Sequence, residues 1–186
     1  MKRLILLFAL VGLIIAAYDR NAAVSYAKKN YNKANHDCST SHDSCSPYAY
    51  FGSEHCNYGS HGGNCANFVS QCLVKGGSHP KLVGSDVCRG YPCGFEEPGA
   101  WELGHCLPQK GWKTECGYLM KPPSYIKAGD VLIYHSGSCD GKGHAVLITV
   151  GGTNPKITCQ SSEQLDQHYN YMSDSKPYYQ WLHYND

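Results

Sequence analysis

Eleven cysteines in a chain of 186 residues constrain this protein more than any other feature of its sequence. So many cysteines serve either as disulfide cross-links or as metal ligands. No C-x-x-C pair occurs, and Cys88/Cys93 and Cys38/Cys45 are spaced more widely than the cysteines of structural zinc sites. We therefore expect disulfides, with no metal and no cofactor. Because eleven is odd, at least one cysteine is left over for an intermolecular link or for a reactive thiol.

The first residues predict export, which is the setting in which disulfides persist. Lys2 and Arg3 precede an unbroken apolar run that ends with the small residues Ala16 and Ala17. This is the pattern of a signal peptide. The alternative is a membrane anchor, but the run is shorter than the roughly 20 residues that span a bilayer. We predict a signal peptide over residues 1–17 and a secreted protein without stable membrane association.

The rest of the chain, residues 18–186, is long enough for one compact domain and too short for two ordinary ones. A net charge of +1 gives no footprint for nucleic acid, which requires clustered Lys and Arg. The charged fraction of 17% lies below the ~25% that is usual in soluble domains. Polar uncharged residues fill the difference, as is common outside cells. We expect a single secreted domain that acts as a monomer.

Two helices are predicted in the first part of this domain. The first covers residues 18–33, where Asp19 can cap the helix and alanines recur at helical spacing. The second covers residues 64–77, because one face carries Cys65, Phe68, Val69, Cys72 and Leu73. Asn64 is suited to the N-cap of this helix, and Gly76-Gly77 to its end. Residues 35–63 are expected to form an irregular loop that disulfides hold.

Strands follow after a segment, residues 78–124, to which we assign no regular structure. Apolar and β-branched residues predict strands over 130–135, 144–150, 156–160 and 178–184. Helices that precede a run of strands are typical of an α+β protein, with a mainly antiparallel sheet.

Cys65 is the candidate nucleophile because it lies at the first turn of the second helix, behind Gly62-Gly63. The free N–H groups of a helix N-terminus lower the pKa of a thiol and can also donate to an oxyanion. The alternative is that Cys65 is a half-cystine or a core cysteine. Cys72, two turns along the same face, is the more natural core or disulfide cysteine.

His144 is the candidate base among ten histidines, because it alone begins a clearly predicted strand and is therefore held in a defined orientation. The alternative is a strand-edge histidine that faces solvent. A third polar group usually orients such an imidazole. Gln160, on the strand that follows, can accept from the imidazole N–H, and His168 and Glu163 in the loop beyond are substitutes.

Three blocks of the sequence are similar to the putative amidase domain family. The central block is Tyr58 to Leu73, with its G-G-N-C-A-N-F-V-S-Q-C-L run. The run Y-D-R-N-A-A-V-S-Y-A from Tyr18 resembles the family's first helix. The third block is A-G-D-V from Ala128, followed by His144. The family has Asp where this chain has Asn64, and it usually has His where Gln160 aligns.

The resemblance implies a papain-like fold related to the NlpC-type and CHAP cell-wall enzymes. It places the nucleophile at Cys65 and the base at His144, and it leaves Gln160 as the third catalytic residue. Tyr58 and Asn64 are assigned to substrate binding. For Tyr58, a packed aromatic ring is an equally good interpretation.

These observations predict a secreted cysteine amidohydrolase or peptidase that acts on peptides of bacterial peptidoglycan, with ten cysteines available for five disulfides. An inactive binding module for cell-wall peptides or glycans is the first alternative. A disulfide-rich structural or toxin-like protein is the second. The sequence selects neither the scissile bond nor the disulfide pairing.

Overall fold

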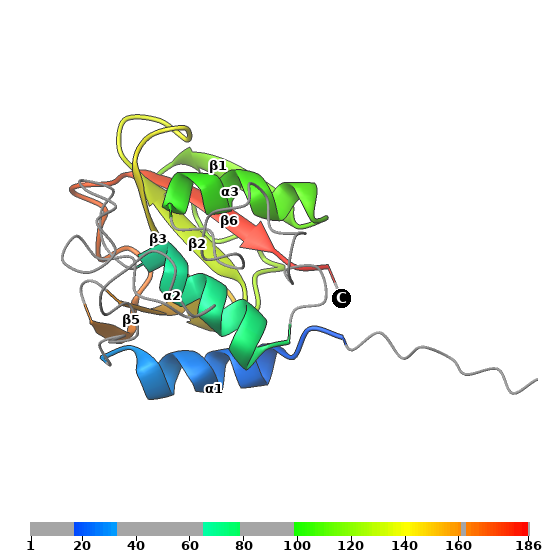
Figure 1. The fold of residues 1–186 in the computed structure, drawn as a ribbon. Helices are drawn as coiled ribbons and strands as arrows, with labels where there is room; N and C mark the ends of the chain where they lie inside the picture. The colour runs from blue at the N-terminus through cyan, green and yellow to red at the C-terminus, as the bar shows by residue number, and fades with distance from the viewer. Residues whose placement is uncertain (1–16, 33–64, 79–98, 161–162, 186) are drawn as a thin grey trace, which may run out of the picture.

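A computed structural model describes residues 17–32, 65–78, 99–160 and 163–185 of the chain. Three helices pack on one face of a six-stranded antiparallel sheet (Figure 1). This confirms the predicted α+β class, and the helix that begins at Cys65 lies against the strand that contains His144. The predicted signal peptide, the loop over 35–63, and the site residues Tyr58 and Asn64 lie outside the described residues.

Helix α1 (Arg20–Asn30) begins where its sequence predicts. The carboxylate of Asp19 accepts from the backbone N–H of Ala22 at 2.9 Å, which satisfies one of the free donors at the helix start. Ala23 and Ala27, one turn apart, are fully buried, so α1 approaches its neighbours through the smallest side chains on its surface.

Helix α2 (Cys65–Gln71) continues as the π-helix η2 (Cys72–Gly76). The helix ends at Gly77 as predicted, but Gly77 has φ −93°, which any residue adopts. The glycine is needed for a different reason. A Cβ atom there would lie 2.2 Å from the ring of Tyr18, at the start of α1. Close packing between the two helices, rather than a left-handed turn, therefore requires Gly77.

The sheet has the strand order β1-β6-β2-β3-β4-β5, with every neighbouring pair antiparallel. Four strands were predicted and two were not. The predicted strands are β2 (Val131–His135), β3 (Gly143–Val150), β4 (Lys156–Cys159) and β6 (Tyr178–His183). The edge strands β1 (Lys113–Tyr118) and β5 (Gln164–His168) and the helix α3 (Ala100–Gln109) were not expected from the sequence.

The two faces of the sheet pack against different partners. Alternate residues of β2 and β3, such as Ile133 and Ala145, face the helices and pack with Cys65 and Phe68 of α2. The intervening residues face the opposite side, where a second core forms, to which no helix of the described ranges contributes. Its members are Ile126, Leu132, Tyr134, Val146, Ile148, Ile157, Cys159, Tyr179 and Trp181. Tyrosines and methionines of the adjoining loops cover this core.

Asp130 joins the two ends of the domain. Its buried carboxylate lies 2.6 Å from Nη1 of Arg20 on α1 and 2.7 Å from Nδ1 of His183 on β6. It also accepts from the backbone N–H groups of Lys127 and Tyr184, at 2.7 and 3.2 Å. The first and third blocks of the family resemblance, which contain Arg20 and Asp130, are thus in direct contact.

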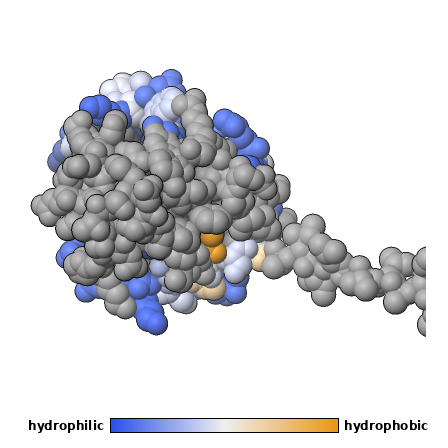
Figure 2. Space-filling model, in the orientation of Figure 1, coloured by the Kyte–Doolittle hydropathy of each residue, from blue (hydrophilic) through white to orange (hydrophobic). Residues whose placement is uncertain are grey.

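Where described residues reach the surface in Figure 2, most are hydrophilic, with only small apolar areas. The large exposed hydrophobic side chains are Tyr118, Leu119, Val150 and Leu165. Within the described ranges, no helix is both long enough and apolar enough to cross a bilayer.

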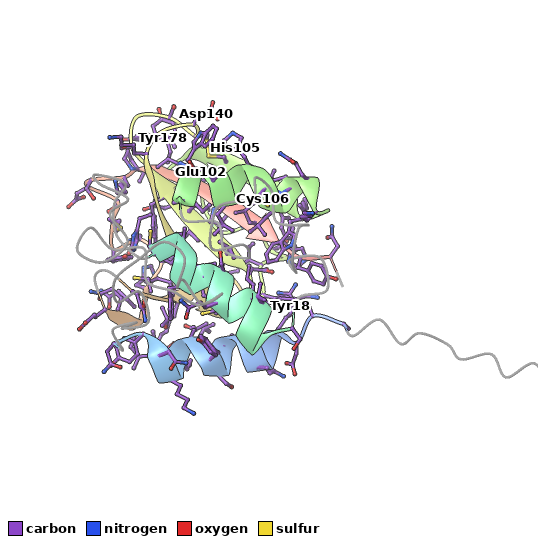
Figure 3. The ribbon with its side chains drawn as sticks, viewed as in Figure 1. Tyr18, Glu102, His105, Cys106, Asp140 and Tyr178 are labelled. Carbon is purple, nitrogen blue, oxygen red and sulfur yellow. A yellow bond between two sulfur atoms is a disulfide. The ribbon has the colours of Figure 1, made fainter. Side chains whose placement is uncertain are left out.

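A disulfide joins Cys116 of β1 to Cys139 in the turn between β2 and β3. The same turn reaches α3, where Oδ1 of Asp140 lies 3.5 Å from Nε2 of His105 (Figure 3). Cross-linking residues 23 positions apart stabilises the fold by about 3 kcal/mol in the chain-entropy account. The turn that leads into β3 is therefore linked to β1 by the disulfide and contacts α3 through Asp140 and His105.

The disulfide count differs from the prediction. Cys65, Cys72 and Cys159 are buried thiols. With three of the eleven cysteines in the thiol form, at most four disulfides can form rather than five. The odd count predicted at least one free thiol, and in the described part of the chain three cysteines are buried thiols.

Candidate active site

Cys65 is the first residue of α2 and is only 6% exposed. Its side chain belongs to the core between the helices and the sheet. The backbone of Ala145, the residue that follows His144 on β3, is among the groups that act to lower the pKa of the Cys65 thiol, so it lies near the sulfur. The packing of α2 on β3 therefore brings the candidate nucleophile to the segment that carries the candidate base.

His144 lies at the start of β3, directly across from Tyr134 of β2. The two rings are nearly parallel, with 15° between their planes and 6.4 Å between their centroids. Because side chains alternate along a strand, His144 faces the second core, whereas Ala145 faces α2. In the described part of the chain, Nε2 of His144 is buried and has no hydrogen-bond partner.

Cys65 and His144 thus approach the start of β3 from opposite faces of the sheet. Among the described residues, no hydrogen bond joins their side chains. Such contacts are often long in a free enzyme and shorten when substrate binds.

Gln160, the expected third residue, is directed elsewhere. It is 5% exposed, and its Nε2 donates to the carbonyl of Asn30, at the end of α1, at 2.6 Å. His168, a substitute for Gln160, lies on β5 and interacts with the side chains of Asn154 and Asn170. In the described residues, neither Gln160 nor His168 hydrogen-bonds to His144.

The Cys65 thiol differs from the sequence-based expectation. A helix N-terminus was expected to lower its pKa, but burial raises this pKa above its usual value of about 9. Backbone N–H groups of Ala145, Ala66 and Cys65 itself act in the opposite direction and are outweighed. Because the sulfur is almost inaccessible to water, desolvation of the thiolate dominates. The Cys65 side chain at rest is therefore the neutral thiol.

His144 is also neutral at physiological pH. Burial lowers its pKa from about 6.5 to about 4, and the positive charge of Lys176 acts in the same direction. The free site is therefore a thiol and an imidazole rather than a thiolate and an imidazolium. This arrangement suits a base that removes the proton as the sulfur attacks.

The lowered pKa of His144 predicts a loss of stability in acid. Between pH 6.5 and about 4 the unfolded chain binds a proton at residue 144 that the folded protein does not bind. The free energy of unfolding therefore falls as the pH decreases through this range, by about 3 kcal/mol from this residue. The variant His144→Gln cannot titrate, so denaturant unfolding at pH 7 and pH 4 should show a smaller loss. An equal loss in parent and variant would contradict the assignment.

Tyr134 was not singled out in the sequence, although its relation to His144 follows once the two strands are paired in register. Cys159, whose sulfur is 3.4 Å from the hydroxyl of Tyr171, and Lys176 also lie close to the candidate residues. In the ranges that the structure describes, no cluster of three or more His, Cys, Asp or Glu side chains could hold a metal ion.

Comparison with known proteins identifies one family. The sequence matches the family described as putative amidase domain over residues 17–183. A comparison with curated proteins finds no match. Among solved structures, a chain of the type VI effector–immunity complex Tae3–Tai3 from Ralstonia pickettii is similar. The sequences are 20% identical, the alignment covers 90% of this chain and 100% of the other, and the TM-score is 0.41.

Proposed function

The chain belongs to the putative amidase domain family, and on that basis we propose that it hydrolyses amide bonds with Cys65 as nucleophile and His144 as base. The observation that carries the proposal is the position of the Cys65 sulfur. It lies at the start of α2, near the backbone of Ala145, the residue that follows His144 on β3, and Nε2 of His144 is buried with no partner within the described ranges. A nucleophile and a base held on two packed elements is the arrangement that acyl transfer requires.

The proposed reaction begins from the neutral pair. As the Cys65 sulfur forms a bond to the amide carbonyl carbon, its proton passes to His144. Backbone N–H groups at the start of α2 stabilise the oxyanion. His144 then gives this proton to the leaving amine as the C–N bond breaks. In the second half, His144 takes a proton from water, the hydroxide attacks the thioester, and the thiol is restored.

We propose peptide amides as the substrate class, with peptidoglycan peptides first, since the sequence resembles cell-wall enzymes. The predicted signal peptide and the disulfide between Cys116 and Cys139 support action outside the cell. The Cys116–Cys139 bond, near the start of β3, stabilises the fold in the oxidising conditions outside the cell.

Two observations favour a second function. The raised pKa of the Cys65 thiol, and the lack of a hydrogen bond to His144 in the described residues, would also suit a protein that binds cell-wall peptides without cleaving them. Such a protein would retain affinity for peptidoglycan fragments and release no product.

The test is hydrolysis of soluble muropeptides by the purified mature protein, with products identified by mass spectrometry. Amide cleavage that iodoacetamide abolishes, with the label at Cys65, supports the proposal. Because burial raises the thiol pKa, the labelling rate should still increase above pH 9. Binding of muropeptides without cleavage would replace the hydrolase by the binding module.

A further inference from the structure

We infer that Tyr134 is the residue that positions His144, through ring packing, in the place where a polar third residue was expected. The inference rests on the proposed function, because it concerns the base of that same reaction. It assigns Tyr134 a positioning role and no contact with the reacting atoms.

Hydrogen bonds do not orient the His144 ring in the described part of the chain. Its Nε2 is buried without a partner, and the amide of Gln160 donates instead to Asn30. A base must nevertheless present its ring edge in a defined direction, because a displacement of about 1 Å can cost a hundredfold in rate. Among the described residues, the group that holds the ring is therefore something other than a polar third residue.

Tyr134 makes the ring contact that can do so. It lies directly across from His144 in the β2–β3 pair, and its ring is nearly parallel to the imidazole at a centroid distance of 6.4 Å. This distance lies within the range of offset-stacked rings. Contact with a flat ring restricts the plane of the imidazole without forming a hydrogen bond to either ring nitrogen.

Tyr134 is itself held from several sides. Its side chain is fully buried, and its hydroxyl donates to the carbonyl of Tyr169 at 2.6 Å. The rings of Tyr171 and Tyr179 meet it edge-on, each at a centroid distance of 5.5 Å. The ring is therefore a fixed surface rather than a mobile neighbour. It also helps to keep water away from the imidazole, whose burial keeps it neutral.

The test compares Tyr134→Phe, which keeps the ring, with Tyr134→Leu, which removes it. We expect Tyr134→Phe to keep kcat within about threefold, and Tyr134→Leu to lower kcat by about 10- to 100-fold with little change in KM. Removal of the ring should also admit water to the imidazole. The apparent pKa of the acid limb of kcat/KM should therefore rise in Tyr134→Leu, toward the ordinary pKa of histidine. Gln160→Ala tests the polar third residue that the sequence predicted, and its kcat should fall less than that of Tyr134→Leu.

A measurement without turnover covers the case in which Tyr134→Leu folds poorly. In the parent and in Tyr134→Phe, the ring protons of His144 should show aromatic ring-current shifts in the NMR spectrum. Absence of these shifts from the parent overturns the inference. A folded Tyr134→Leu with parental kcat and acid limb also overturns it, as does a larger fall in kcat for Gln160→Ala or an equal fall for Tyr134→Phe.

The two proposals fail in different ways. If Cys65→Ala still hydrolyses the substrate, the proposed function is wrong, whatever Tyr134 does. If Cys65→Ala and His144→Ala are inactive while Tyr134→Leu matches the parent, only the positioning role is wrong.

Discussion

Cys65→Ala is expected to lower kcat for amide hydrolysis by at least about a thousandfold, because the acyl-enzyme can no longer form. The variant should remain folded, since alanine occupies less volume at a site that lies at the end of a helix. Substrate should still bind, so that KM or the dissociation constant changes little. The measurement is steady-state hydrolysis of a muropeptide, with thermal unfolding as the check on folding.

Cys72→Ala is the matched control for this change. Cys72 is also a buried thiol, two turns further along the same helical face, and its pKa is raised well above the ordinary value by burial. Each variant removes a buried sulfur atom from the same helical face. Of the two residues, only Cys65 lies beside the start of β3. Equal losses of activity in folded Cys65→Ala and Cys72→Ala would mean that Cys65 has no special role.

Asp130→Ala is expected to destabilise the fold by about 3–5 kcal/mol, which is a large part of the stability of most domains. The change leaves the mostly buried guanidinium of Arg20, only 13% exposed, without its carboxylate. It also removes the acceptor for His183 and for two backbone N–H groups. Because these groups join α1, the turn before β2 and the end of β6, their loss separates the ends of the domain. Denaturant unfolding measures the effect.

Lys28→Met provides the control for an ion pair that lies at the surface. Lys28 of α1 lies 2.8 Å from Asp166 of β5, and both side chains are about a third or more exposed. An exposed pair of this kind contributes about 0–1 kcal/mol. A loss on Asp130→Ala no larger than that on Lys28→Met would show that the Asp130 network does not hold the fold together.

Local sequence signals were sufficient for the elements whose own residues specify them. Asp19 caps α1, the apolar positions from Cys65 to Leu73 form one face of α2 and η2, and the branched residues of β2 and β3 form central strands. These features depend on spacing along the chain, and spacing can be read directly. Cys65 and His144 were chosen as candidates in the same way, because each lies at the start of an element that the sequence predicts.

The elements that the sequence missed depend on distant partners. Strand β5 reads Q-L-D-Q-H, with no apolar alternation, and it is a strand because it pairs with β4. Strand β1 is likewise an edge strand paired with β6. Helix α3 contains Gly104 and Pro108, which disfavour a helix, and it forms where Leu103 and Leu107 are buried against the core.

The sequence by itself determined which residues could react and on which elements they lie. Only the tertiary structure decided their chemical state and their neighbours. Burial made the Cys65 thiol and the His144 imidazole neutral, against the helix-terminus effect that the sequence predicts. The pairing of β2 with β3 gave His144 the ring of Tyr134, while Gln160 turned to Asn30. Desolvation and cross-strand contact depend on which residues surround a side chain in space, and a linear spacing rule does not contain that information.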